Sequence, residues 1–185
     1  MNAGFVDQIP SGLIQRVQPI ELILMDVDGT LTDGRLQYDN EWLESKAFDV
    51  RDGFGIWLAH SCGLKTGLVT GRQSRLVSER ARELNIEIVY QGRFDKGLIL
   101  EDVMASTGLS EAQIAFVGDD LFDLPLLRRV GFAAAPADAH PEVRRRAHFV
   151  SQFAGGRGAV REVIELILKG KGLWEGILQR FCSGD

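Results

Sequence analysis

Residues 20–27, with the sequence IELILMDV, form a nearly continuous apolar run that leads into two acidic residues, Asp26 and Asp28. A short apolar run without polar alternation, closed by Asp and Gly, is typical of a strand that is buried on both faces. Such strands belong to parallel sheets that are covered by helices on both sides. The run therefore predicts this architecture. It also raises the question of why a buried strand ends in two carboxylates that repel each other.

Segments of the same kind recur along the chain and alternate with helical patterns. Further strands are expected at residues 64–71, 86–92, 114–119, 132–137 and 148–151, and helices at 52–63, 74–85, 96–108, 121–131, 140–147 and 158–170. This alternation predicts an α/β fold with a doubly wound parallel sheet. Two extended segments flank residues 40–42, so a projecting β-hairpin is expected over about residues 34–50. The tail from residue 170 is expected to form a short amphipathic segment that packs against a partner.

Length and composition limit the class of protein. The 185 residues suffice for one domain, and since the chain shows no repeat or linker we expect a single domain over residues 1–185. The net charge of −5 argues against a nucleic-acid-binding surface, and no apolar run approaches the roughly 20 residues of a membrane span. Residues 1–12 lack the features of a signal peptide, so we expect a cytoplasmic protein without nucleic-acid or membrane partners.

Polar residues are concentrated where the expected strands end. They are Asp26 and Asp28 after the first strand, Thr70, Gly71 and Arg72 after the second, Asp119 and Asp120 at the end of the strand at 114–119, and Lys96 at the start of the helix at 96–108. A single Asp at such a position is often only a helix N-cap. In an open parallel sheet, however, binding sites form beyond the carboxyl ends of the strands. The clusters together therefore predict one functional site at this edge of the sheet.

The acidic residues of this site require a positive counter-charge. Asp26, Asp28, Asp119 and Asp123 would repel one another strongly in a pocket of low dielectric constant. Lys96 supplies one positive charge, and a hard divalent cation supplies the rest. Because the available ligands are all oxygen atoms, the favoured ion is Mg²⁺. Together with a nearby hydroxyl group, these groups are typical of a phosphoryl-transfer site in which a carboxylate attacks phosphorus.

Four short motifs carry a family resemblance. DVDGT at residues 26–30, LVTG at 68–71, FDKG at 94–97 and VGDDLFD at 117–123 resemble, in this order, the four motifs of the haloacid dehalogenase superfamily of phosphotransferases. The motifs span residues 20–123, and the strand order resembles the superfamily over almost the whole chain. The resemblance implies a Rossmann-like fold and a Mg²⁺-dependent phosphoryl transfer.

The same resemblance implies a role for each residue of the site. Four are expected to act in the transfer itself: Asp26 as the nucleophile, Asp28 as the general acid and base, and Thr70 and Lys96 as holders of the phosphoryl group. Three are expected to ligate Mg²⁺: Asp26, Asp28 through its backbone carbonyl, and Asp119. Asp120 and Asp123 are expected in the outer shell, although acidic residues are also common at helix N-termini.

Longer segments, at residues 33–56, 70–86, 90–92, 118–127, 137–141 and 155–168, are similar to one branch of this superfamily, the 3-deoxy-D-manno-octulosonate 8-phosphate phosphatases. This resemblance implies hydrolysis of that sugar acid phosphate in lipopolysaccharide precursor synthesis. It also implies a homotetramer without cap domains, in which the hairpin closes over a neighbour's active site. The apolar residues Leu36, Tyr38 and Phe48 on the hairpin would be unfavourable in a monomer. The alternative is a hairpin that folds back on its own domain.

The choice of substrate depends on Arg72 and Arg80, which with Gly71 are the candidate substrate-binding residues. Arg80 lies eight residues after Arg72, near the same face of the expected helix, and two guanidinium groups can bind a sugar-acid carboxylate. By the resemblance, Arg after Thr-Gly is typical of the octulosonate enzymes, and Glu is typical of those acting on a nine-carbon sugar acid. Two alternatives stay open: a phosphatase of a nine-carbon sugar acid phosphate, and a non-catalytic subunit on the same fold.

Overall fold

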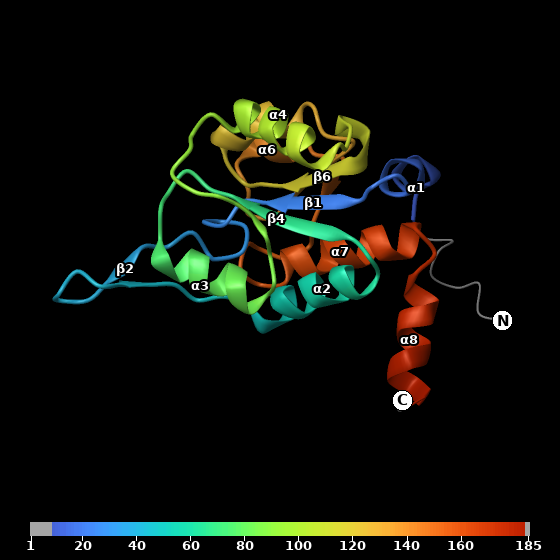
Figure 1. Ribbon diagram of the computed structural model, residues 1–185, viewed down its shortest axis with the longest axis horizontal. Coiled ribbons are helices and arrows are strands. Elements are labelled where there is room, and N and C mark those ends of the chain that lie inside the picture. Colours follow the sequence, from blue (N-terminus) through green and yellow to red (C-terminus); the bar gives the residue numbers. More distant parts are fainter. Residues whose placement is uncertain (1–8, 184–185) are drawn as a thin grey trace.

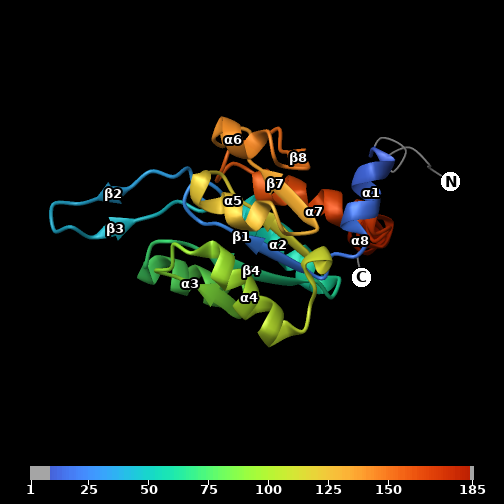
Figure 2. The same cartoon turned by 90° about the horizontal axis from the view of Figure 1, so that it is seen from above.

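The computed structural model describes residues 9–183, whose helices and strands are drawn in Figures 1 and 2. The expected lack of a signal peptide concerns residues that lie mostly outside this range. Six strands form a parallel sheet in the order β5-β4-β1-β6-β7-β8. Their bounds are Leu22–Met25 for β1, Lys65–Val69 for β4, Ile88–Tyr90 for β5, Ile114–Val117 for β6, Phe132–Ala135 for β7 and Phe149–Val150 for β8. The predicted doubly wound α/β sheet is confirmed.

Helices cover both faces of this sheet (Figure 1). One face is covered by α2 (Val50–Ser61), α3 (Arg75–Glu83) and α7 (Ala159–Gly170), with α1 (Ser11–Val17) and α8 (Trp174–Ser183) packed against α7. The other is covered by α4 (Lys96–Thr107), α5 (Leu124–Leu127) and α6 (Pro141–Arg144). In β1, Ile23 and Met25 pack into the first core and Leu22 and Leu24 into the second. Because both faces are covered, the strand shows no polar alternation.

The chain between β1 and α2 forms the predicted hairpin. β2 (Gln37–Tyr38) and β3 (Glu44–Ser45) are antiparallel, and they pair Gln37 with Ser45 and Tyr38 with Glu44. The hairpin extends away from the sheet, beyond the end at which β1 finishes (Figures 1 and 2). Trp42 lies in its turn with a positive φ of 62° and is 80% exposed, and Leu43 is 62% exposed. The tip of the hairpin therefore exposes two large apolar side chains.

The helix expected over residues 121–131 is instead two short helical turns, η3 (Leu121–Asp123) and α5. Asp120 begins η3, and Asp123 turns its carboxylate back to the backbone N–H groups of Asp119 and Asp120. Pro125, near the start of α5, has no N–H group to donate into a continuous helix. The predicted helix was therefore too long, and the break directs the Asp123 side chain toward the carboxyl end of β6.

Local signals set the ends of other elements. Ser110 and Gln113 form a capping box at η2 (Glu111–Gln113). Gly63 and Gly108, with φ of 80° and 72°, follow α2 and α4 in the left-handed region that ends helices. The amphipathic segment expected in the tail is α8, whose Ile177 is buried. Within residues 9–183, every helix is too short or too polar to cross a membrane.

Candidate active site

The two central strands carry the first acidic residues of the site. β1 and β6 are neighbours, but the chain passes from β1 toward β4 and from β6 toward β7, which lie on opposite sides. Their carboxyl ends therefore flank the crevice in which open α/β sheets bind ligands. The backbone N–H of Asp26 donates to the carbonyl of Val117 over 2.9 Å. This hydrogen bond extends the ladder and holds Asp26 beside Asp119, which follows β6 by two residues.

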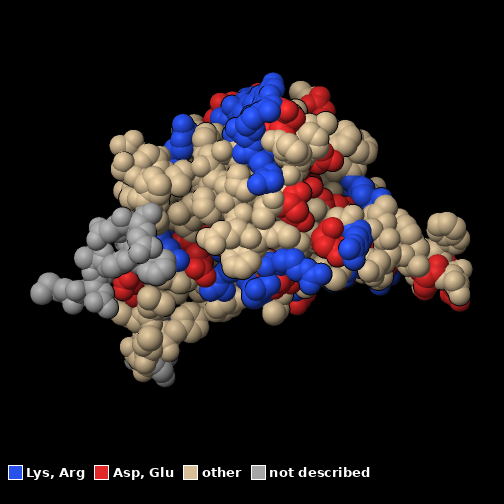
Figure 3. Space-filling model, turned by 180° about the vertical axis from the view of Figure 1, so that it is seen from behind, with Lys and Arg blue, Asp and Glu red and all other residues tan. Residues whose placement is uncertain are grey.

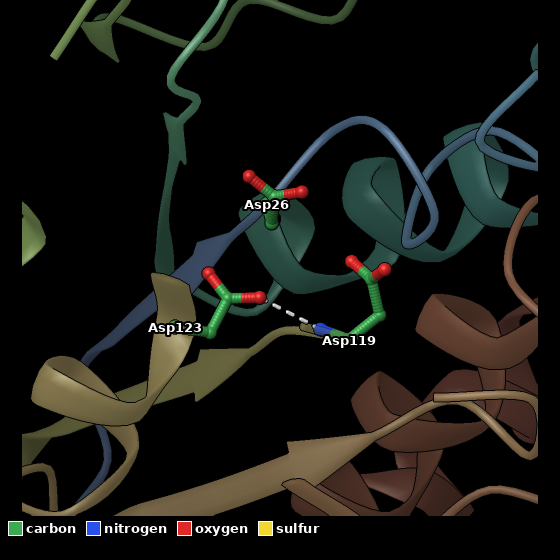
Figure 4. Close-up of side chains that lie close together, drawn as sticks. All are labelled: Asp26, Asp119 and Asp123. Atoms are coloured by element: carbon green, nitrogen blue, oxygen red, sulfur yellow. Dashed lines mark hydrogen bonds between the residues drawn. The ribbon is translucent and has the colours of Figure 1, made fainter. Parts of the chain in front are cut away.

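Three carboxylates converge at this point. Asp26, Asp119 and Asp123 each offer an oxygen atom within 4.8 Å of the others, and Figure 4 shows their side chains turned toward one space. Burial raises the pKa of Asp26 well above its ordinary value and the pKa of Asp119 to about 7. The charge of Asp123 is the second cause in both cases. The ionised forms are disfavoured because low dielectric and like charges both oppose them. A bound cation would relieve this cost.

Two residues of the loop after β1 fix the position of Asp119. The hydroxyl of Thr30 donates to Oδ1 of Asp119 over 3.1 Å. Gly29 has a positive φ of 95°, and a Cβ atom at this position would overlap the Asp119 carboxylate. Glycine is therefore required at position 29 for two reasons: the positive φ of the backbone and the close approach of the Asp119 carboxylate.

Asp123 is held by backbone and side-chain donors. Its Oδ2 accepts from the N–H groups of Asp119 at 2.7 Å and Asp120 at 3.2 Å; the first of these bonds is the dashed line in Figure 4. A Cβ atom at Gly118 would overlap the same carboxylate. Asp120, in contrast, is exposed and accepts from the N–H of Leu121. Of the two acids expected in the outer shell, the structure places Asp123 in the carboxylate cluster and Asp120 as the cap of η3.

Lys96 supplies a positive charge to the cluster from the start of α4. Asp95 caps this helix by accepting from the N–H of Leu98, and the Lys96 side chain enters the core. Its ammonium group donates to Asp26 over 2.6 Å and also to Asp123. Burial lowers the pKa of Lys96, but the charges of Asp26 and Asp123 outweigh burial and raise it overall. Lys96 therefore stays charged, and its ammonium group pairs with two of the three carboxylates, Asp26 and Asp123.

The donor set of this cluster fits Mg²⁺. Carboxylate oxygens from Asp26, Asp119 and Asp123 are hard ligands, and magnesium typically uses one or two of them together with water and substrate phosphate. One lysine leaves the cluster with an excess of negative charge, which a divalent ion would neutralise. Asp26 and Asp119 are the expected side-chain ligands that the structure places here.

A pocket of about 270 Å³ opens over the cluster. It is lined by Asp26, Asp28, Thr70, Gly71, Arg72, Phe94, Lys96, Asp119, Asp120, Phe122 and Asp123. The aromatic rings of Phe94 and Phe122, with centroids 5.9 Å apart, stand exposed at its rim. Nearly all of the site residues expected from the sequence thus meet in one pocket, and the two aromatic rings add an apolar wall that the sequence analysis did not include.

Asp28 lies in the same pocket but outside the carboxylate cluster. Its Oδ1 pairs with the ammonium group of Lys46, and its Oδ2 lies 3.8 Å from Nε of Arg72. Glu44 lies next to this pair and bonds both Ser74 and Arg72. Sequence reasoning missed Lys46 and Glu44. The two residues are two positions apart on the hairpin's return strand, so their side chains share one face. This spacing is the signal in the sequence that could have indicated them.

The two candidate arginines are separated in the structure. Arg72 lines the pocket, and its Nη2 donates to the hydroxyl of Tyr38 at 3.0 Å and to Glu44 at 3.2 Å. Arg80 lies outside this pocket, where it pairs with Glu83 at 2.8 Å and its guanidinium stands over the ring of Phe48. Within one chain, therefore, the geometry does not bring both guanidinium groups to one ligand.

Comparisons with known proteins agree with this geometry. Residues 79–164 match the haloacid dehalogenase-like hydrolase family. The chain is 40% identical to the 3-deoxy-D-manno-octulosonate 8-phosphate phosphatase KdsC of Yersinia pestis over 179 residues, which cover 95% of this chain and 96% of that protein. The chain belongs to this phosphatase family. Its expected haloacid dehalogenase-like fold and its activity class, phosphoric monoester hydrolysis, are thereby confirmed.

Solved structures of the phosphatase family superpose closely on this chain. A probable YrbI family phosphatase from Pseudomonas syringae has a TM-score of 0.92 at 42% identity, covering 94% of this chain and 98% of that one. The 3-deoxy-D-manno-octulosonate 8-phosphate phosphatase from Moraxella catarrhalis, in complex with magnesium ion, phosphate ion and KDO, has a TM-score of 0.91 at 36% identity, covering 94% and 99%. Together with the carboxylate cluster, that complex confirms the expectation of a Mg²⁺ cofactor.

Proposed function

We propose that this chain is a Mg²⁺-dependent phosphatase that converts 3-deoxy-D-manno-octulosonate 8-phosphate into 3-deoxy-D-manno-octulosonate and inorganic phosphate. The observation that carries the proposal is the convergence of Asp26, Lys96, Asp119 and Asp123 beyond β1 and β6, in a chain of this family. The product belongs to lipopolysaccharide precursor synthesis in the family, and we assign this chain to the same process in the cytoplasm.

In the first step, an oxygen of Asp26 attacks phosphorus. The new O–P bond forms as the bond from phosphorus to the sugar oxygen breaks, and Asp28 gives its proton to that leaving oxygen. Lys96 and the hydroxyl of Thr70 hold the phosphoryl oxygens, and Asp123 orients Lys96. Mg²⁺, when held by Asp26, Asp119 and the backbone carbonyl of Asp28, neutralises charge on the phosphoryl group.

In the second step, water removes the phosphoryl group from Asp26. Asp28, now ionised, accepts a proton from the water, whose oxygen attacks phosphorus while the bond to Asp26 breaks. Inorganic phosphate leaves, Asp26 returns as a free carboxylate, and Asp28 has regained its proton. The two carboxylates lie in different surroundings: Asp26 belongs to the acidic cluster, whose excess negative charge Mg²⁺ would neutralise, and Asp28 lies outside it, beside Lys46 and Arg72.

Substrate selection is assigned to Arg72 and Gly71. Arg72 faces the pocket and offers a planar set of donors that matches a carboxylate. A Cβ atom at Gly71 would overlap the ring of Phe94, so glycine lets this aromatic wall close on the pocket. Arg80 is not assigned to the pocket of its own chain, because it lies outside it.

We further propose that residues 1–185 form one domain and that four copies assemble so that each hairpin covers a neighbour's site. The exposed Trp42 and Leu43 support this, because large apolar side chains gain stability when another chain buries them. A site without a cap domain is open to water, and a neighbouring hairpin would exclude water from the reaction.

The proposed substrate is tested by steady-state kinetics with Mg²⁺. We expect a higher kcat/KM for 3-deoxy-D-manno-octulosonate 8-phosphate than for the phosphate of a nine-carbon sugar acid. Arg72→Glu is expected to lower kcat/KM for the first substrate at least about tenfold, since it removes hydrogen bonds to a charged group. A preference for the nine-carbon acid would support that alternative. A protein inert toward a panel of sugar phosphates would support the non-catalytic alternative.

A further inference from the structure

Lys46 is a buried lysine that the mechanism above does not use. It follows β3, and its side chain is 1% exposed. Lysine is almost never removed from water to this extent unless its charge is paired. Its ammonium group pairs with Oδ1 of Asp28 and lies 3.5 Å from Glu44. The position of Lys46 is therefore tied to a residue that the proposed function places at the reacting atoms.

Asp28, Glu44, Lys46 and Arg72 together form a set that we call the hairpin-base network. Arg72 reaches Glu44 at 3.2 Å from one side, and Lys46 reaches Asp28 from the other. Two carboxylates and two cations balance in charge, which lowers the cost of removing the Lys46 ammonium group from water. Figure 3 shows acidic and basic side chains intermixed where the hairpin leaves the body of the molecule. The network thus joins the hairpin to the pocket.

Two atoms of the hairpin-base network have no hydrogen-bond partner. Among the residues that the structure describes, Oδ2 of Asp28 and Nε of Arg72 are the buried side-chain atoms left in this state. They lie 3.8 Å apart, which is too far for a hydrogen bond. Both residues line the pocket. Since buried polar atoms are normally satisfied, the pair indicates that a ligand in the pocket supplies the missing partners.

We infer that Lys46 is a positioning residue: it holds Oδ1 of Asp28 so that Oδ2 faces the reacting oxygen, and it keeps Asp28 from closing onto Arg72. Without Lys46, the cation nearest to Asp28 is Arg72, and arginine favours bidentate contact with a carboxylate. That contact would engage both oxygens of Asp28 together with Nε of Arg72 and withdraw them from the substrate. The inference rests on the proposed function, because that function assigns the proton transfers to Asp28.

The consequence can be observed with p-nitrophenyl phosphate. In the first step Asp26 takes the phosphoryl group and p-nitrophenolate leaves as a stable anion, so no proton from Asp28 is needed. In the second step water attacks phosphorus, its proton passes to Asp28, and the bond to Asp26 breaks. A misplaced Asp28 slows the second step far more than the first, so enzyme phosphorylated on Asp26 accumulates.

The experiment compares three variants with the wild-type protein in Mg²⁺. Lys46→Met is expected to lower kcat for p-nitrophenyl phosphate about 100-fold, the usual contribution of a positioned acid or base. It is also expected to raise the phosphorylated fraction, measured by acid quenching and intact mass spectrometry. Lys46→Arg keeps the positive charge but can engage both oxygens of Asp28, so it is expected to lower kcat and raise the phosphorylated fraction by less than Lys46→Met does. Lys65→Met removes an exposed lysine from the start of β4 and is expected to match the wild type.

Several outcomes would overturn the inference. They are a wild-type kcat in Lys46→Met, a lower kcat of Lys46→Met without excess phosphorylated enzyme, and a kcat of Lys46→Arg below that of Lys46→Met. If Lys46→Met does not fold, Lys46→Gln is measured with the same direction of change expected. A wild-type protein active on p-nitrophenyl phosphate but inert toward the sugar acid phosphate would overturn only the proposed substrate. Inactivity toward both would overturn both proposals.

Discussion

Two buried acidic regions of this molecule can be compared directly: the cluster of Asp26, Asp119 and Asp123, and Asp52 on α2. Asp52 and Asp123 are each 1% exposed. Burial raises the pKa of Asp52 to about 6, and burial together with Asp123 raises that of Asp119 to about 7. By burial and by direction of pKa shift the two regions look alike, so neither measure by itself distinguishes a functional acid from a structural one.

The regions differ in what satisfies the carboxylate oxygens. The oxygens of Asp52 accept from the backbone N–H groups of Gly158 at 3.2 Å and Arg161 at 2.8 Å, at the start of α7. Unpaired N–H groups and the helix dipole both favour a carboxylate at that position. The cluster instead groups three carboxylates around one lysine below an open pocket. Asp52, whose oxygens both have donors, therefore joins α2 to α7. The cluster, in which carboxylates outnumber the lysine, instead forms a site for a cation.

The largest expected effect on activity comes from replacing the nucleophile Asp26 in the acidic cluster. Asp26→Asn should lower kcat for phosphate release by on the order of 10⁴-fold or more, since removal of a covalent nucleophile has effects of this size. The metal-free variant should unfold at the same temperature as the wild type or higher, because one of three like charges is removed and Asn can still accept from Lys96. Phosphate assays and thermal unfolding measure the two quantities. Full residual turnover would refute the role of Asp26.

The opposite pattern is expected at Asp52. Asp52→Ala should lower the free energy of unfolding by about 1–3 kcal/mol, because two buried N–H groups lose their acceptor. The kcat of the folded protein should stay unchanged. Denaturant titration gives the stability, and Asp102→Ala, which removes an exposed partner of Arg93, is the matched control at about 0.5 kcal/mol or less. Equal losses in both variants would show that the N–H contacts of Asp52 contribute little.

The smallest expected effect is a pH-dependent stabilisation by Mg²⁺. The pKa of Asp119 rises from an unfolded value of about 3.9 to about 7 in the metal-free fold. Between these values the folded state binds more protons than the unfolded state, so its stability falls as pH rises through this window. Mg²⁺ replaces the protons and binds more tightly when they are absent. The rise in Tm on adding Mg²⁺ should therefore be larger at about pH 8 than at about pH 5.

Thermal unfolding with Mg²⁺ or with a chelator measures this difference, and Asp52 provides the internal comparison. Asp52→Ala leaves the cluster intact, so its Mg²⁺-dependent rise in Tm should vary with pH as in the wild type. In Asp119→Asn the rise should be small at both pH values. A rise that is independent of pH in the wild type would contradict the assignment of the acidic cluster as the cation site.

The sequence predicted the meeting of Asp26 and Asp119 because both follow apolar strands, and neighbouring parallel strands deliver their ends to one edge. It placed Asp123 less well, because the expected helix over 121–131 is broken and the side chain turns back onto the N–H of Asp119. It also related Arg80 to Arg72 by helical spacing. That relation fails because α3 begins at Arg75, so Arg72 precedes the helix and its spacing to Arg80 has no helical meaning.

The sequence by itself therefore determined the parallel sheet, the polar residues that follow its strands and the need for a cation among them. These features depend on periodicity and charge, which are local properties of the chain. The tertiary structure alone decided that Lys46 and Glu44, on a hairpin that follows the first motif, bond Asp28 and Arg72. Such pairing depends on where a projecting segment returns to the body. The spacing of Glu44 and Lys46 shows only that they share one face of the hairpin; it does not record which residues that face meets, because a loop's path is set by packing at its two ends.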